Sequence, residues 1–289
     1  MKGTGYCSML LGLQVSTEGK IYDSIERAER LNCNTMQIFS RNPKRWRDNY
    51  IDLKDADEFR KRRKKSNIKL LFIHVPYLMN IASPNPSLYE ASIEAYIEDA
   101  LEAHTLEADY IVTHMGSHKN TSEEAGIKRL IDALDTILEK TKNTDTGILL
   151  ENTAGSGSWL GYKFSHQKKI LQNLKDRERI GLCLDTAHAF LAGYDISTKE
   201  GLDSALDEID NVGKGLLKMI HLNDAKDKLG SHRDRHEHIG KGKIGIEGME
   251  RIINHPRLRS LPFILETPKK TDKDDAVNLN TVRKLRHAR

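Results

Sequence analysis

Six acidic or histidine side chains each end a short apolar run, and they recur along the chain at a nearly regular interval. The gaps between them are 40, 37, 34, 36 and 45 residues, and one βα unit takes roughly 30 residues or more. Imidazole and carboxylate groups without thiolates suit zinc or manganese in a hydrolytic site. Six buried ionisable groups would each be costly without a counter-ion, so the pattern predicts a metal site. The six residues are His74, His114, Glu151, Asp185, His221 and Glu266.

The elements that must position these side chains are eight short apolar runs separated by helical patterns. We expect strands over residues 9–15, 35–39, 69–74, 110–114, 147–151, 181–185, 217–221 and 262–266. Amphipathic helices are expected over 21–31, 88–107 and 122–140. Eight alternations in a chain of this length predict an α/β fold, a single (β/α)8 TIM barrel over residues 1–289. The strand ends of such a barrel meet at one face, so the metal cluster should lie there. We expect the basic end, 283–289, to fray.

Strand alternation predicts what lies beneath the metal ligands. Residues two positions apart in a strand face the same side, so the residue two before each ligand should point into the barrel. All six of these residues are apolar or small, as the packed interior of a barrel requires. They are Phe72, Val112, Leu149, Cys183, Met219 and Ile264.

Three further candidate ligands come from segments that follow strands. His188 lies three residues after Asp185, and Asp234 and His236 form an Asp-x-His pair in a charged loop after the seventh strand. In extended chain the two side chains of such a pair point to one side. Nine candidates exceed what one ion needs, and two or three ions would share them. Closely spaced ions are typical of phosphodiester hydrolysis.

Several segments carry a family resemblance, in order along nearly the whole chain. The segments are HVPYLMN at 74–80, THMGSH at 113–118, ENTAGSGSWLGYKF at 151–164, GLCLDTAH at 181–188, HLNDAK at 221–226 and DRHEHIGKGKIG at 234–245. Together they resemble the endonuclease IV (deoxyribonuclease IV) family of bacterial type, the second class of apurinic/apyrimidinic (AP) endonucleases. Two departures are Gln14, where related sequences have His, and Ala187, where they have Cys or Ser.

The resemblance implies a TIM barrel that holds three zinc ions, with manganese as a possible substitute. It assigns the first ion to His74, His114 and bridging Glu151, and the second to Glu151, Asp185, His221 and Glu266. The third falls to His188, Asp234 and His236. It also implies hydrolysis of the phosphodiester bond 5′ to an abasic site, leaving a 3′-hydroxyl and a 5′-deoxyribose phosphate, together with trimming of blocked 3′ ends. Glu151 and Glu266 would be catalytic: Glu151 would bridge two ions around a hydroxide nucleophile, and Glu266 would help to orient it. The third ion would stabilise the leaving 3′-oxygen.

Basic and aromatic residues predict where duplex DNA with abasic sites or blocked 3′ ends would bind. The segment RNPKRWRDNY, 41–50, follows the second strand, so Lys44, Arg45 and Trp46 should lie on the site face. Tyr77 follows the third strand and is similar to a family residue that intrudes at the abasic site. The densest basic run, RKRRKK at 60–65, precedes the third strand, and we interpret it as a solvated helix face at the opposite end.

Composition narrows the classes of protein without selecting one. The net charge of +4 permits nucleic-acid binding without requiring it. Three cysteines without a C-x-x-C spacing fit a reducing compartment, and no signal or membrane segment is evident, so we expect a cytoplasmic monomer without membrane contact. Two alternatives are a metal-dependent sugar isomerase or epimerase on the same barrel and a non-catalytic DNA-lesion binder. The third ligand group and the basic loop favour the nuclease.

Overall fold

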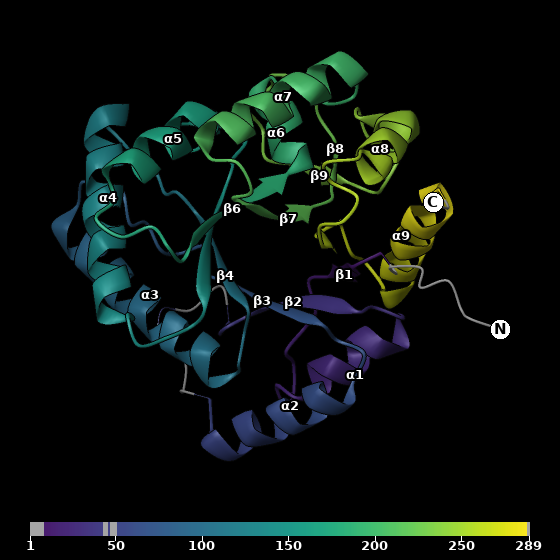
Figure 1. Cartoon of the computed structure of the whole chain (residues 1–289), viewed down its shortest axis with the longest axis horizontal. Helices are drawn as coiled ribbons and strands as arrows, with labels where there is room; N and C mark the ends of the chain where they lie inside the picture. The colour runs from purple at the N-terminus through teal and green to yellow at the C-terminus, as the bar shows by residue number, and fades with distance from the viewer. Residues whose placement is uncertain (1–8, 43–45, 47–50, 288–289) are drawn as a thin grey trace.

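In the computed structural model, which describes residues 9–42, 46 and 51–287, eight parallel strands form a barrel with helices around it (Figure 1). The strands neighbour one another in the order β1-β10-β7-β6-β5-β4-β3-β2. The predicted (β/α)8 TIM barrel is confirmed. Its strands are β1 (Leu11–Leu13), β2 (Thr35–Phe39), β3 (Leu70–His74), β4 (Tyr110–His114), β5 (Gly147–Glu151), β6 (Ile180–Asp185), β7 (Leu217–His221) and β10 (Phe263–Leu265).

Helices follow the strands and cover the outside of the barrel. They are α1 (Asp23–Arg30), α2 (Leu53–Lys65), α3 (Pro86–Thr105), α4 (Glu123–Lys140), α5 (Phe164–Asn173), α6 (Thr186–Ala192), α7 (Lys199–Val212), α8 (Gly245–Asn254) and α9 (Asp272–Leu285). A short antiparallel hairpin, β8 (Asp224–Ala225) with β9 (His236–Glu237), follows β7. In the part of the chain that the structure describes, no helix combines the length and apolar character that crossing a membrane requires.

The barrel closes where its first two strands meet. Gln14, directly after β1, forms a parallel bridge with Gln37 of β2. A Cβ atom on Gly12 would lie 1.9 Å from the carbonyl oxygen of Thr35. Only a residue without a side chain therefore allows β1 to approach β2 this closely.

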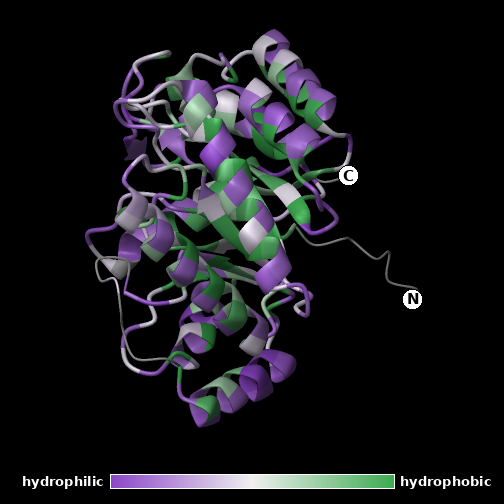
Figure 2. Cartoon of the chain, turned by 90° about the vertical axis from the view of Figure 1, so that its left-hand side faces the viewer, coloured by the Kyte–Doolittle hydropathy of each residue, from purple (hydrophilic) through white to green (hydrophobic). Residues whose placement is uncertain are grey.

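The interior of the barrel is a separate apolar cluster enclosed by the strands. It consists of the six residues predicted from strand alternation, all at most 2% exposed: Phe72, Val112, Leu149, Cys183, Met219 and Ile264. A second, larger core lies between the strands and the helices. Figure 2 shows apolar residues on the strands and on the helix faces turned towards them, with polar residues on the outside. This packed interior supports the strand ends above it.

Element boundaries differ from the sequence expectations by a few residues, mostly for reasons of capping. The expected start at Ser122 is the N-cap of α4, because its side chain accepts a hydrogen bond from the backbone N–H of Ala125. Helix α3 begins two residues earlier than expected, at Pro86, after the N-cap Asn85. Strand β1 is shorter than expected.

The expected fraying of the basic C-terminal end is wrong for its described residues. Arg283 donates hydrogen bonds to the carbonyl oxygens of Leu31 and Asn32. His287 lies 2.7 Å from Glu250. These contacts hold the end of α9 and the residues after it against the barrel.

Candidate metal centre

The carboxyl ends of six neighbouring strands converge on one face of the barrel, as predicted. Strands β3, β4, β5, β6 and β7 end on His74, His114, Glu151, Asp185 and His221, and Glu266 directly follows β10. These strands are consecutive in the sheet, so their last residues form an unbroken arc. Four of the six residues are buried, whereas the side chains of His114 and Glu266 are 18% and 16% exposed.

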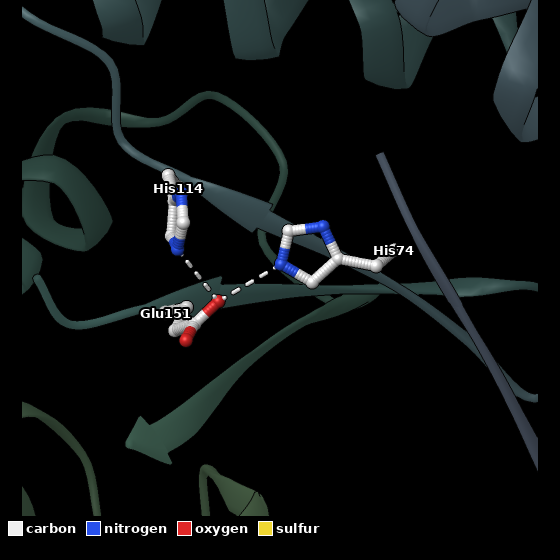
Figure 3. Close-up of side chains that lie close together, drawn as sticks. All are labelled: His74, His114 and Glu151. Atoms are coloured by element: carbon white, nitrogen blue, oxygen red, sulfur yellow. Dashed lines mark hydrogen bonds and ion pairs between the residues drawn. The ribbon is translucent and has the colours of Figure 1, made fainter. Parts of the chain in front are cut away.

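Glu151 lies at the centre of this arc and presents each carboxylate oxygen to a different pair of histidines. Its Oε2 lies 3.1 Å from Nε2 of His74 and 3.1 Å from Nε2 of His114 (Figure 3). Its Oε1 lies 2.9 Å from Nδ1 of His221 and 3.4 Å from Nδ1 of His188. One carboxylate therefore belongs to two separate groups of donor atoms.

Potential metal ligands form three overlapping groups in which the donor atoms of each lie within 4.8 Å of one another. Two of these groups match the ligand sets that the sequence resemblance implies for the first two ions. The groups are His74, His114 and Glu151; Glu151, Asp185, His221 and Glu266; and Asp185, His188 and His236.

The third group differs in one member from the set implied by the resemblance. Asp185 takes part in it, with Oδ2 3.7 Å from Nε2 of His236. The expected member, Asp234, also lies beside the two histidines, because its Oδ1 is 3.1 Å from Nε2 of His188 and 3.6 Å from Nε2 of His236. The β8–β9 hairpin carries His236 back to the barrel mouth. All nine expected ligands thus lie together.

Outer hydrogen bonds to backbone carbonyls orient three of the histidine rings. Nδ1 of His74 lies 2.7 Å from the carbonyl oxygen of Val75, and Nδ1 of His188 lies 2.9 Å from that of Asn152. Nδ1 of His236 lies 3.0 Å from the carbonyl oxygen of Glu266. In each case the carbonyl requires an N–H, so the other ring nitrogen keeps its lone pair for the centre. Metal-binding histidines are held in this way.

Two buried asparagines hold the carboxylate ligands, and sequence reasoning missed both. Asn223 donates from Nδ2 to Oδ2 of Asp185 at 2.6 Å and accepts the backbone N–H of Glu266 at 2.8 Å. The side-chain amide of Asn152 donates from Nδ2 to the carbonyl oxygen of Asp185, and its Oδ1 accepts the backbone N–H of Asp185. Their only sequence signal is their place inside the quoted segments, directly after Glu151 and two residues after His221.

The electrostatics of the cluster favour anionic carboxylates close to cationic partners. Burial would raise the pKa of Glu151, but His221 and His114 outweigh it and hold the pKa well below its usual range. Burial would lower the pKa of His188, but Asp185 foremost raises it well above its usual value. A bound cation would take the place of the histidine protons.

The donor atoms of the cluster fit a borderline or hard divalent ion. They are imidazole nitrogens and carboxylate oxygens, which suit zinc and manganese. The thiol of Cys183 is buried in the barrel interior, and burial raises its pKa to about 12. None of the three ligand groups found among the described residues contains a cysteine.

Comparisons with known proteins agree with this arrangement. A family model described as xylose isomerase-like TIM barrel matches residues 25–286. The probable endonuclease 4 of Halothermothrix orenii is 42% identical over 272 residues, which cover 94% of this chain and 98% of that protein. Endonuclease IV from Thermus thermophilus has a solved structure that is 32% identical, with a TM-score of 0.84, covering 95% of this chain and 98% of that one. The chain belongs to the endonuclease IV family.

More distant structures share only the barrel with this endonuclease IV family member. A D-tagatose 3-epimerase-like protein superposes with a TM-score of 0.72 over 96% of both chains, but it is only 20% identical. That likeness extends to the fold alone. The relation to sugar-converting enzymes therefore concerns the scaffold, and the side chains at the barrel mouth must decide the chemistry.

A small cavity opens beside the cluster in this endonuclease IV family member. Its volume is about 180 Å³. Tyr77 lies at its edge, 57% exposed, with its ring 6.4 Å from that of His114 and stacked on it. Trp159, which sequence reasoning did not single out, packs edge-on against His114 at 5.8 Å. The lining residues are Tyr77, His114, Thr153, Ala154, Ser156, Trp159 and Asp234.

In the basic segment after β2, residues 41–50, the structure describes only Arg41, Asn42 and Trp46. Trp46 is 38% exposed, whereas Lys44 and Arg45 lie outside the described residues. Arg41 is mostly buried: it pairs with Asp99 at 3.0 Å and donates to the carbonyl oxygen of Trp46 at 2.8 Å. Its guanidinium therefore links the backbone at Trp46 to α3.

The basic run 60–65 lies on α2, and several of its charges are paired with acids. Arg63 contacts Asp109 at 2.6 Å, and Lys64 contacts Glu107 at 3.2 Å. Both acids precede β4, so they lie at the end of the barrel opposite the cluster. The predicted position of this run, remote from the site, is confirmed, but the face is solvated only in part: Lys61, Lys64 and Lys65 are exposed, whereas the side chain of Arg63 is only 13% exposed.

Proposed function

We propose that this chain is a metal-dependent AP endonuclease of DNA repair. It hydrolyses the phosphodiester bond 5′ to an abasic site in duplex DNA, leaves a 3′-hydroxyl and a 5′-deoxyribose phosphate, and trims blocked 3′ ends. Three zinc ions, replaceable by manganese, would occupy the three ligand groups. The names of the relatives support this activity, since the Halothermothrix protein is named a probable endonuclease 4 and the Thermus structure an endonuclease IV.

The observation that carries the proposal is the sharing of Glu151 and Asp185 between ligand groups. Each belongs to two of the three groups, so neighbouring ions would lie close together. Closely spaced ions clamp both the attacking and the leaving oxygen of a phosphodiester. The third group, which consists of Asp185, His188 and His236 with Asp234 beside both histidines, goes beyond what a sugar isomerase would need.

The residues of the chain would act mainly by holding and orienting. Glu151 would join the first two groups through its two oxygens, and Glu266 would orient the attacking water from the rim. His188, Asp234 and His236 would face the departing 3′-oxygen. The ions would lower the pKa of a bound water towards neutrality and stabilise negative charge on the leaving oxygen.

Exposed aromatic residues near the cluster would engage the DNA. The ring of Tyr77 stands at the barrel mouth between the cavity and solvent, in edge-on contact with Phe39 at 5.4 Å. An aromatic ring can occupy the space that a missing base leaves in the stack, where stacking contributes about 1–3 kcal/mol per base. Trp46, Lys44 and Arg45 would contact the backbone and bases on the neighbouring side.

A duplex with one central stable abasic analogue tests the proposal. The labelled strand should be cut once, immediately 5′ to the analogue, and a polymerase should extend the product directly because it ends in a 3′-hydroxyl. An undamaged duplex of the same sequence is the control and should stay intact. Absence of incision, together with conversion of a ketose into its epimer, would replace the proposal by the sugar-epimerase alternative.

A further inference from the structure

One histidine of the cluster is oriented differently from the three that contact backbone carbonyls. His74, His188 and His236 each direct a ring nitrogen to a backbone carbonyl oxygen. His221 instead directs Nε2 to a side chain, the amide oxygen of Gln37, at 2.8 Å. The orientation of the His221 ring therefore depends on a side chain, which a point mutation can remove, and not on a backbone carbonyl.

Gln37 connects two members of the same ligand group. It is fully buried on β2. Its Oε1 accepts from His221, while its Nε2 donates to Oε1 of Glu266 at 2.7 Å and to Oε1 of Gln14 at 2.8 Å. A flipped amide would set its oxygen against the Glu266 carboxylate, which only accepts, so the network fixes the amide orientation.

This orientation determines which atoms face the cluster. With its proton on Nε2, His221 keeps the Nδ1 lone pair, and Nδ1 lies 2.9 Å from Glu151 and 3.3 Å from Oε2 of Glu266. Gln37 donates to the other oxygen of Glu266, Oε1, at 2.7 Å. Both ligands are thus aimed by one amide.

We infer that Gln37 is a positioning residue of the metal centre: its amide selects Nδ1 of His221 as the ligand atom and aims Oε2 of Glu266 at the same ion. The inference rests on the proposed function, since it takes the second ligand group to hold an ion. Gln14 supports Gln37 from one side but contacts neither ligand through any bond that the structure shows.

Metal binding to the apoprotein tests this role without DNA. Gln37→Met keeps the volume and removes both bonds, whereas the matched control Gln14→Met leaves both in place. Zinc affinity is measured by competition with a chromophoric chelator, and the visible absorption of the cobalt-loaded protein reports ligand geometry. Loss of a hydrogen-bond partner of a metal ligand typically weakens metal affinity 10–100-fold. Gln37→Met should therefore lower the affinity for one of the bound ions by that factor and alter the cobalt spectrum. Gln14→Met should match the wild type.

The outcomes separate the inference from the proposed function. If wild-type apoprotein binds neither zinc nor cobalt, the metal-dependent function itself fails. If wild type and Gln37→Met bind equally and give the same spectrum, only the role of Gln37 is overturned. Should Gln37→Met not fold, Gln37→Glu retains the acceptor for His221 but loses the donor to Glu266. An unchanged cobalt spectrum in that variant would also overturn the inference.

Discussion

Oε1 of Glu151 lies 2.9 Å from Nδ1 of His221, while the other oxygen of the same carboxylate faces His74 and His114. One side chain at the end of β5 therefore joins ligand groups from both sides of the barrel mouth. The carboxylate is fully buried, and it can be stable there only with positive partners around it. A bridge between two ions satisfies that requirement.

Replacing the bridge should abolish turnover while the barrel remains folded. Glu151→Gln keeps the volume but removes the charge that two ions would share, so both should bind more weakly and the pKa of bound water should rise. Incision of an abasic duplex should fall by about two orders of magnitude or more. Circular dichroism should be unchanged. Cleavage close to the wild-type rate would show that Glu151 does not bridge.

The third ligand group should be separable from the other two. His188→Ala removes a ring that contacts Asp234 and lies beside His236, but it leaves His74, His114 and Glu266 in place. Elemental analysis should find about three zinc ions in the wild type and about two in the variant, with most turnover lost. Equal metal content in both proteins would contradict the assignment of His188.

Salt dependence should distinguish the two basic segments. Each lost phosphate contact lowers the slope of log affinity against log salt by about 0.9, so Lys44→Ala with Arg45→Ala should flatten the slope by up to about twice that. Arg62→Gln with Lys64→Gln is the matched control, because these residues pair with Glu58 and Glu107 and their helix lies far from the barrel mouth. Equal losses from both pairs would mean that the DNA contacts both ends of the barrel.

A half-buried carboxyl on α3 should make stability fall as pH rises. Burial raises the pKa of Glu102 to about 7, against a partly compensating hydrogen bond from the backbone N–H of Ile51. Because the folded-state pKa lies above the unfolded value, the stabilisation is complete below about pH 4.5 and is lost as pH rises through about 7.

Substitution of this carboxyl provides the measurement. Glu102→Gln cannot ionise, so its melting temperature relative to wild type should be higher at pH 8.5 than at pH 5. The corresponding change in the free energy of unfolding should be on the order of 1 kcal/mol. One pKa unit corresponds to about 1.4 kcal/mol, and a partly buried group realises only part of its shift. A gap between the two proteins that does not change with pH would refute the raised pKa.

The barrel and the strand-end cluster could be predicted because both follow from periodicity. Each of the six strand-end residues closes an apolar run, and the residue two positions before it faces the interior. Phe72 below His74 and Leu149 below Glu151 show this directly. Strand geometry leaves few other arrangements for such a pattern.

The residues that orient the ligands could not be predicted, because their partners are distant in sequence. Gln37 lies 184 residues from His221, and Asn223 lies 38 residues from Asp185. A neutral amide also carries no periodic or charge signal of its own. Arg41 illustrates the same limit: it begins the basic segment, but its guanidinium lies 3.0 Å from Asp99 on α3. Only the packed structure reveals that partner.

Incision activity measured during zinc titration of the apoprotein tests the central claim most directly. Chelator-treated protein receives zinc in stoichiometric steps, and the rate of cutting 5′ to a single abasic analogue is recorded at each step. The account predicts no cutting by the apoprotein and a rate that reaches its maximum only near three equivalents of zinc. Full activity at one equivalent, or cutting that persists in the chelated protein, would contradict it.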